Sequence, residues 1–269
     1  MNFFDPLAQL RALIILAIIS TISLRYHLLD RKGVLASILI GYLIFTLGGV
    51  EHFIILLLFF GLSSIATKVR VREIGANFSE KDWIRGWRNV LANGLVPTLI
   101  IVSGYISQPQ YRSLATIGYL ATVGTAFADT LATEVGLFYP KKPRLITNFK
   151  EVAKGTPGAV SPYGYVGGLL ASLTICVFSY ALGLANLSSI PIIISASMIG
   201  MTIDSFIGAA IQAKYRCRVC GKITENSHHC NQQSERIMGV KIINTHMVNL
   251  ISTAIGGGAA LILFSLLMS

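Results

Sequence analysis

The feature that most constrains this chain is a series of long apolar segments separated by short connections. A helix needs about 17–25 mostly apolar residues to cross a bilayer. Eight segments reach or approach that length: Leu7–Leu29, Gly33–Gly49, His52–Thr67, Val90–Ser107, Ser113–Val135, Tyr165–Leu184, Ile190–Ala213 and Thr245–Leu267. Only 13% of the residues are charged, against about 25% in soluble domains. We therefore predict an all-α polytopic membrane helix bundle, with about eight transmembrane helices in a single domain over residues 1–269.

The positive charges predict how this bundle is oriented. Lysine and arginine gather after the first, third, fifth and seventh segments, while the other connections hold a single arginine. By the positive-inside rule the basic loops are cytoplasmic, and the N- and C-termini lie outside. The first segment is expected to be a spanning helix and not a removable signal peptide, because it lacks a basic leading region and a cleavage motif. No aromatic-interleaved basic patch is present, so nucleic acid is not an expected partner.

Acidic residues within these apolar segments are the first candidates for function. Asp129 and Glu134 lie in "AFADTLATEVG", and Asp204 lies at a similar depth in a later segment that runs in the same direction. A carboxylate in hydrocarbon is costly and is usually paired or functional. One interpretation is an interhelical hydrogen bond or an ion pair with Arg25 or a loop lysine. The other is Mg²⁺, which binds through one or two carboxylates together with substrate phosphates.

Helix geometry limits which acids share a metal. Residues five apart on an ideal helix point about 140° away from each other, so Asp129 and Glu134 do not share a face. Asp129 instead shares a face with Thr133, and Thr130 with Glu134, and the two threonines can add hydroxyl ligands. Either the helix breaks at the following glycine or only one of its acids touches the metal. We favour Asp129 with Asp204 as Mg²⁺ ligands and keep Glu134 as a third candidate.

A glycine-rich basic loop follows the fifth segment and is suited to anions. Lys150 and Lys154 can neutralise phosphates, Gly155 lets backbone amides approach, and Thr156 and Ser161 can donate hydrogen bonds. The loop is not a P-loop, because the chain contains no G-x-x-x-x-G-K-[ST]. The alternative is a flexible connection that faces anionic lipid.

A second basic stretch, "EKDWIRGWRNVLANG", leads into the fourth segment and carries Arg85, Arg88, Asn89 and Asn93. Its alternative interpretation is an interfacial helix with Trp83 and Trp87 at the level of the lipid headgroups. That placement would still leave Arg88 and Asn89 able to face a shared site, with Asn93 one turn further on.

Three of the four cysteines cluster in the basic loop 214–241, in "CRVCGKITENSHHC". Cys-x-x-Cys followed by His-Cys has the composition of a structural zinc site, here Cys217, Cys220, His229 and Cys230. His229 and Cys230 are adjacent, which makes it difficult for both to reach one ion. A redox pair and unrelated thiols are the alternatives, although a disulfide is disfavoured in a cytoplasmic loop.

Six stretches also carry a resemblance to a known family over nearly the whole chain. They are "RKGVLAS", "GWRNVLANG", "AFADTLATEVG", "RLITNFKEVAKGTPGAVSPYGYVGGLLAS", "IDSFIGAAIQAKYRC" and "THMVNLIS". The chain resembles the integral membrane family that includes plant phytyl-phosphate kinase and vertebrate transmembrane protein 19. It departs from that family at Leu131, where tryptophan is frequent, and at "GTPGAVS", where G-T-N-G-G-V-S is more usual.

The resemblance implies a membrane-embedded kinase that moves the γ-phosphoryl group of a nucleoside triphosphate, typically CTP, to an isoprenyl monophosphate. The family's acidic block corresponds here to Asp129, Thr130, Thr133 and Glu134, and its second aspartate to Asp204. Its loop corresponds to Lys150, Lys154, Gly155, Thr156 and Ser161, and its further polar positions to Asn93 and Asn249. Among these residues, Asp129, Lys150, Lys154 and Asp204 are expected to be catalytic.

The expected reaction needs two anionic partners held in line more than it needs a general base. Mg²⁺, the nucleotide, the prenyl phosphate and membrane lipids are therefore the expected partners of a site that faces the cytoplasm from the cell membrane. A cytidylyltransferase that makes a CDP-lipid would use the same parts. An ion-coupled transporter would use intramembrane aspartates, although it would place them near the midplane.

Overall fold

The computed structural model describes residues 6–74, 84–221 and 223–268. Within them lie eight α-helices: α1 Pro6–Arg25, α2 Arg31–Leu43, α3 Val50–Ile74, α4 Trp87–Ile106, α5 Arg112–Gly136, α6 Pro162–Ala181, α7 Ile190–Ala210 and α8 Thr245–Met268. Seven segments of these residues are long and apolar enough to cross a membrane, and α1 is not among them. The predicted all-α membrane bundle is therefore confirmed, and apart from α2 and α3 the helix ends lie within a few residues of those expected.

Two helices differ from their predicted segments. α2 continues into η1, a π-helical stretch over Ile44–Gly48 that ends at Gly49 with φ of 96°. α3 extends beyond the predicted end at Thr67 as far as Ile74, so that Arg70 lies on the helix itself. Of the two tryptophans expected at the membrane interface, Trp87 begins α4 and Trp83 lies outside the described residues.

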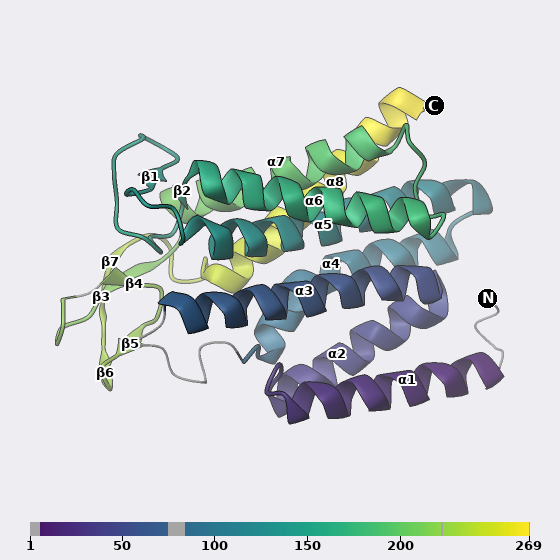
Figure 1. Ribbon diagram of the computed structural model, residues 1–269, viewed down its shortest axis with the longest axis horizontal. Helices are drawn as coiled ribbons and strands as arrows, with labels where there is room; N and C mark the ends of the chain where they lie inside the picture. The colour runs from purple at the N-terminus through teal and green to yellow at the C-terminus, as the bar shows by residue number, and fades with distance from the viewer. Residues whose placement is uncertain (1–5, 75–83, 222, 269) are drawn as a thin grey trace.

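The helices run side by side, and their ends divide into two groups (Figure 1). All of the strands gather at one end, on the left in Figure 1, together with the C-terminal ends of α1, α3, α5 and α7. The first turn of α1 and the last turns of α8 lie at the other end. This alternation agrees with the predicted topology, while the side of the membrane on which each end lies stays a prediction.

Helix α5 forms the centre of the bundle. It contacts α3, α4, α6, α7 and α8, and 72% of its candidate span is buried inside the structure. Small residues let its neighbours approach closely, as they do in other membrane bundles. A Cβ added to Gly200 of α7 would lie 2.5 Å from Cγ2 of Thr125 on α5. Asp129 and Asp204 each follow this contact by four residues on their helices. The two aspartates therefore lie one turn beyond the close contact, on the same faces of α5 and α7.

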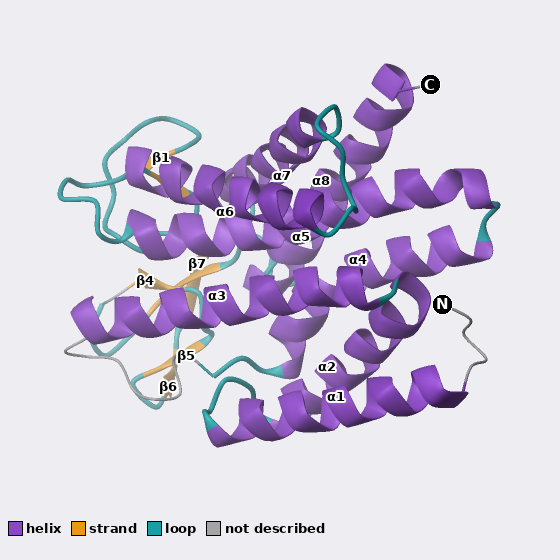
Figure 2. Ribbon diagram, turned by 45° about the vertical axis from the view of Figure 1, so that its right-hand side comes forward, coloured by secondary structure: helices purple, strands orange, loops and turns teal. Residues whose placement is uncertain are grey.

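Short strands occupy the two longest described connections (Figure 2). Strand β1 (Arg144–Leu145) pairs antiparallel with β2 (Ala159–Val160) in the loop between α5 and α6. Between α7 and α8, β3 (Lys214–Arg216) lies between β4 (Ile223–Thr224) and β7 (Glu235–Met238), all antiparallel. A separate hairpin pairs β5 (His228–His229) with β6 (Gln232–Gln233). The two connections therefore form small folded units that sit over the helix ends.

Candidate active site

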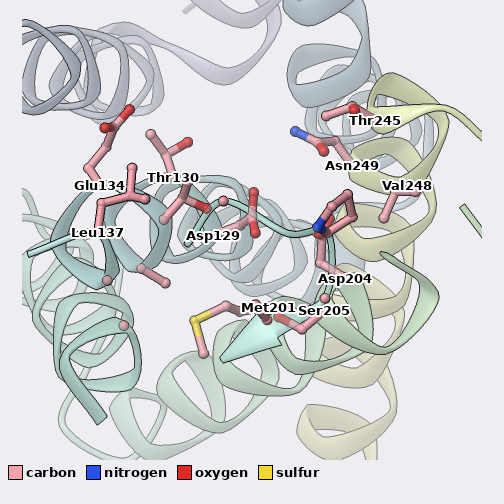
Figure 3. A pocket seen from close by; sticks show the side chains of 18 of the residues that line it. Asp129, Thr130, Glu134, Leu137, Met201, Asp204, Ser205, Thr245, Val248 and Asn249 are labelled. Atoms are coloured by element: carbon pink, nitrogen blue, oxygen red, sulfur yellow. The ribbon is translucent and has the colours of Figure 1, made fainter. Parts of the chain in front are cut away.

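A cavity of about 600 Å³ opens at the end of the bundle that carries the strands. Its lining comes from α3 to α8 and from the two folded connections. The predicted site residues that line it are Asn89, Asp129, Thr130, Thr133, Glu134, Lys154, Gly155, Thr156, Ser161, Asp204 and Asn249. Residues far apart in the sequence are thus brought to one place (Figure 3).

Asp129 and Asp204 face each other across this cavity. The two carboxyl groups are close enough to hydrogen-bond to each other when one of them is protonated. Ser252 on α8 donates a hydrogen bond to Oδ2 of Asp204 at 2.9 Å. Among the described residues, the ion pairs are Arg70–Glu134 and Arg144–Glu151, so neither aspartate pairs with a basic side chain. Two adjacent, half-buried carboxylates without a basic partner could hold a cation.

Glu134 has a different environment from the two aspartates. Arg70 Nε contacts Oε2 of Glu134 at 2.7 Å, and the Thr67 hydroxyl donates to Oε1 at 2.7 Å. Both partners lie on α3, and the carboxylate points away from the aspartates, as the five-residue spacing predicts (Figure 3). The structure therefore uses Glu134 to join α5 to α3, and both of its oxygens are occupied.

A row of polar side chains on α8 continues the site toward α4. Asn249 Nδ2 lies 3.5 Å from Oδ1 of Asn93, and Asn93 Nδ2 donates to the backbone oxygen of Asn89 at 3.1 Å. Asn93 is buried and does not line the main cavity. The predicted asparagines therefore connect two helices of the site, and Asn89 and Asn249 reach the cavity itself.

The glycine-rich loop covers one side of the cavity. Residues 154–161 all line it, and Lys154 Nζ donates to the backbone oxygen of Leu137 at 3.1 Å. Gly155 and Gly158 have φ of 80° and 78°, which other residues rarely adopt. Ser161 caps α6 by accepting a hydrogen bond from the amide of Gly164 at 3.1 Å. The loop thus presents backbone and one lysine to the cavity, although its serine is engaged in capping.

Two predicted basic residues do not reach the cavity. Lys150 is exposed on the far part of the loop, and Arg88 is exposed with its guanidinium 5.4 Å from the ring of Trp87. Arg85, three residues before Arg88, lines the cavity in its place. Helical rotation explains the difference, because α4 begins only at Trp87 and its first turn carries Arg88 outward.

Arg85 is held by a backbone bridge that is not visible in the sequence. Its amide donates to Leu28, and its carbonyl accepts from Asp30, both at 3.1 Å, which ties it to the turn between α1 and α2. Burial lowers the pKa of Arg85 to about 10, so the guanidinium stays charged at neutral pH.

Other lining residues were also missed by the sequence analysis. They include Thr245 and His246 in the first turn of α8 and Glu225 from the connection between α7 and α8. The four-residue step from Thr245 to Asn249 on one helix face could have indicated the first of these. Nothing in the sequence pattern indicates Glu225, because it lies in an irregular loop.

A second, apolar cavity of about 80 Å³ adjoins the first. It lies among α1 to α4, and half of its lining residues are leucine, isoleucine or phenylalanine. Arg85 and Asn89 line both cavities. We call this space the apolar groove; its lining includes Leu16, Ile19, Ser37, Ile40, Phe53 and Leu57.

The cysteines and histidine of the predicted zinc site come together in the connection between α7 and α8. Ligand atoms of Cys217, Cys220, His229 and Cys230 all lie within 4.8 Å of one another. We call these four residues the Cys3His cluster. The fourth cysteine, Cys176, is buried in α6.

Comparison with known proteins gives the relationships of the chain. Residues 14–257 match the family described as "Integral membrane protein DUF92". The chain is 29% identical to an uncharacterized membrane protein of Methanocaldococcus jannaschii, over 91% of this chain and 90% of that protein.

Two plant proteins are also similar. Protein PGR of Arabidopsis thaliana is 30% identical over 90% of this chain and 91% of its own length. The chloroplastic protein VTE6 of the same plant is 27% identical over 87% of this chain and 65% of its own length. No solved structure matches. The chain belongs to the DUF92 family of integral membrane proteins, the family that its motifs indicated.

Proposed function

We propose that this protein is a membrane-embedded kinase that transfers the γ-phosphoryl group of a nucleoside triphosphate, CTP in the first instance, to an isoprenyl monophosphate. The observation that carries the proposal is the meeting of Asp129 and Asp204 in a cavity walled by a basic, glycine-rich loop. The motif resemblance to phytyl-phosphate kinase supports the same reaction class.

The donor set suits a magnesium ion. Asp129 and Asp204 supply carboxylate oxygens, Ser252 orients Asp204, and neither acid has a basic partner among the described residues. Oxygen-only sites with one or two carboxylates, completed by substrate phosphates, are typical of Mg²⁺. When bound, the ion would neutralise charge on the transferring phosphates. We leave Glu134 out of this site because Arg70 and Thr67 already occupy its oxygens.

The remaining cavity residues are placed to bind phosphates. Arg85 offers a half-buried guanidinium with five donors, and Lys154 offers an ammonium group beside the backbone of Gly155 and Thr156. We assign Arg85 to the acceptor phosphate, because it also borders the apolar groove, and Lys154 with the loop to the nucleotide.

The chemical step then requires positioning more than proton transfer. An oxygen of the ionised acceptor phosphate forms a bond to the γ-phosphorus of the nucleotide. The bond from that phosphorus to the β–γ bridging oxygen breaks, and the nucleoside diphosphate leaves with the electron pair. Arg85, Lys154 and the loop amides hold both anions in line, so no general base is needed.

The apolar groove supports a lipid acceptor. It joins the main cavity at Arg85 and Asn89, so a phosphate bound at Arg85 can extend an apolar tail between α1 and α4. Burial of an isoprenoid tail in such a space is favourable by about 25 cal/mol per Å² of apolar surface. The tail thus has a place separate from the nucleotide.

The test is turnover by the full-length protein in detergent with Mg²⁺, CTP or ATP, and prenyl monophosphates. Mass analysis is expected to find prenyl diphosphate and nucleoside diphosphate. Asp129→Asn should abolish turnover, while Glu151→Gln, which alters an exposed acid of the neighbouring loop, should not. Pyrophosphate and a CDP-lipid would instead establish a cytidylyltransferase, and no nucleotide turnover under any condition would contradict the kinase and favour transport.

A further inference from the structure

The connection between α7 and α8 holds a cluster that the proposed kinase does not use. Cys217 follows β3, Cys220 lies three residues on, and His229 and Cys230 are adjacent at the end of β5. The Cys220 and Cys230 sulfurs lie 3.5 Å and 3.2 Å from Nδ1 of His229. Four soft ligands from three separate positions converge on one point.

These spacings match a tetrahedral zinc site. Zinc–sulfur bonds of about 2.3 Å and zinc–nitrogen bonds of about 2.0–2.1 Å place sulfur and nitrogen ligands about 3.6 Å apart. A disulfide between any two of the cysteines would leave the third cysteine and the histidine unexplained. Zinc accounts for all four residues, with no open position for catalysis.

The backbone explains how adjacent residues can both reach the ion. Cys230 and Asn231 have φ of 51° and 57°, an uncommon conformation for residues other than glycine. This turn brings the Cys230 sulfur back toward His229. Gly221, directly after Cys220, has φ of 70°, and the amide of Val219 lies 3.4 Å from the Cys217 sulfur. The local conformation is therefore organised around the ligand atoms.

Residues of the Cys3His cluster lie on both sides, in the sequence, of a residue that lines the main cavity. Glu225 lies between Cys220 and His229, accepts a hydrogen bond from Thr245 at the start of α8, and lines the cavity with the two aspartates. At the base of the same unit, Lys214 Nζ donates to the backbone oxygen of Pro157 in the glycine-rich loop at 3.2 Å. The connection therefore forms one wall of the cavity.

We propose that one structural zinc ion binds to the Cys3His cluster, and that this centre holds Glu225 in the cavity wall. The zinc part stands on the cluster alone. The role of Glu225, which would orient water or cation near Asp129 and Asp204, rests on the proposed function.

The first experiment measures metal in full-length protein purified in detergent without chelator. We expect about one zinc per chain, as four protein ligands hold one ion. Cys220→Ser and Cys230→Ser should lose zinc while eluting as the wild type does, and the matched Cys176→Ser should retain it. Zinc-free wild type that also takes up no added Zn²⁺, or variants that keep the full content, would overturn the site.

Cobalt substitution keeps the zinc proposal testable if a variant fails to fold. Wild type loaded with Co²⁺ should develop sulfur-to-cobalt charge-transfer absorption, and addition of Zn²⁺ should remove it. Absence of such absorption in folded wild type would contradict thiolate coordination.

The second experiment compares Glu225→Gln with Glu235→Gln, which changes an exposed acid on β7 of the same unit. Both should keep zinc. Glu225→Gln should raise the Mg²⁺ concentration needed for half-maximal turnover about tenfold, the usual effect of losing a residue that supports a metal site, and Glu235→Gln should not. An unchanged Mg²⁺ requirement refutes the role of Glu225 alone. A wild type without turnover refutes the kinase, while the metal content still decides the zinc site.

Discussion

Charge balance at single residues separates the acids of this chain into two groups. Glu134 is neutralised by Arg70 and joins α5 to α3. Asp129 and Asp204 lie together, and the described residues give them a serine as hydrogen-bond partner and no basic side chain. Breaking a buried ion pair leaves an uncompensated charge, so Glu134 contributes to stability. Two adjacent carboxylates without a counter-ion instead oppose folding, and the proposed Mg²⁺ would offset that cost. The proposed cation site would explain why the fold accepts the electrostatic cost of placing these two carboxylates together.

Arg85 and Arg88 provide a direct test of this arrangement. Arg85→Gln should lower kcat/KM for the prenyl phosphate about 10²-fold, comparable to losing one preorganised donor in other active sites. Arg88→Gln should change it little, because Arg88 is exposed and stacks over Trp87. Steady-state kinetics with both variants measure the difference.

The opposite result would show that the phosphate contact has been assigned to the wrong arginine. If Arg88→Gln were the more damaging variant, the bridge that holds Arg85 between Leu28 and Asp30 would have no bearing on turnover. Arg85→Lys separates charge from geometry, since lysine keeps the charge but loses the planar fork.

Residue chemistry could be predicted where it depends on helix periodicity, and not where it depends on loops. The 140° angle between Asp129 and Glu134 correctly indicated that they face different partners. The approach of Asp204 to Asp129 followed from equal depth in parallel segments. Arg85 was noted only as part of a basic stretch and not placed in the site, because its position depends on pairing with a distant turn. Lys150 was expected in the site but does not line the cavity, because a loop's path cannot be read from its composition.

At the scale of helices, close packing of α5 and α7 sets the distance between the aspartates. Gly200→Val should push α7 away from Thr125 and from the backbone of Ser252. Overpacking of this kind costs about 1–3 kcal/mol, and a displacement near 1 Å can lower a rate about 10²-fold. Thermal unfolding and turnover should both fall. Gly258→Val, on α8 where an added Cβ meets nothing within 4 Å, serves as the control.

The apolar groove among α1 to α4 predicts how the protein selects chain length. Ser37 lines the groove from α2, and its hydroxyl bonds only within its own helix, to Val34. Ser37→Phe should fill the groove and reduce turnover of a twenty-carbon monophosphate about tenfold relative to a five-carbon one, the scale of a filled apolar pocket.

Leu35→Phe is the matched variant, because Leu35 lies on the same helix and is 69% exposed. It should leave the ratio of rates unchanged. Equal loss for long and short acceptors with Ser37→Phe would place the tail elsewhere. That result would not contradict the proposed phosphoryl transfer itself.

Helices were predictable here and the folded connections were not. Apolar length locates α4 to α8 within a few residues, because a membrane span has few alternatives. The strands β3, β4 and β7 are two to four residues long, too short for an alternating pattern. Only the cysteine spacing indicated that this connection is ordered, through the ligand set and not through secondary structure.

At the scale of the whole molecule, the two ends of the helix bundle differ. The cavity, the glycine-rich loop and the Cys3His cluster all lie at one end, and the first turn of α1 and the end of α8 lie at the other (Figure 1). An enzyme that joins a lipid phosphate to a soluble nucleotide needs its site at one surface of the bilayer. A transporter would need access from both sides, with its acids near the midplane.

This difference between the two ends predicts which side of the membrane each end faces. In intact bacterial cells that express the protein, a membrane-impermeant maleimide should not label the wild type, whose exposed Cys220 and Cys230 lie at the end with the basic loops. Gln108→Cys, in the exposed connection from α4 to α5, should be labelled under the same conditions. Permeabilised cells treated with a metal chelator should label both. Wild type labelled in intact cells, with Gln108→Cys protected until lysis, would invert the topology, and the cavity would then open away from the cytoplasmic nucleotide that the proposed reaction requires.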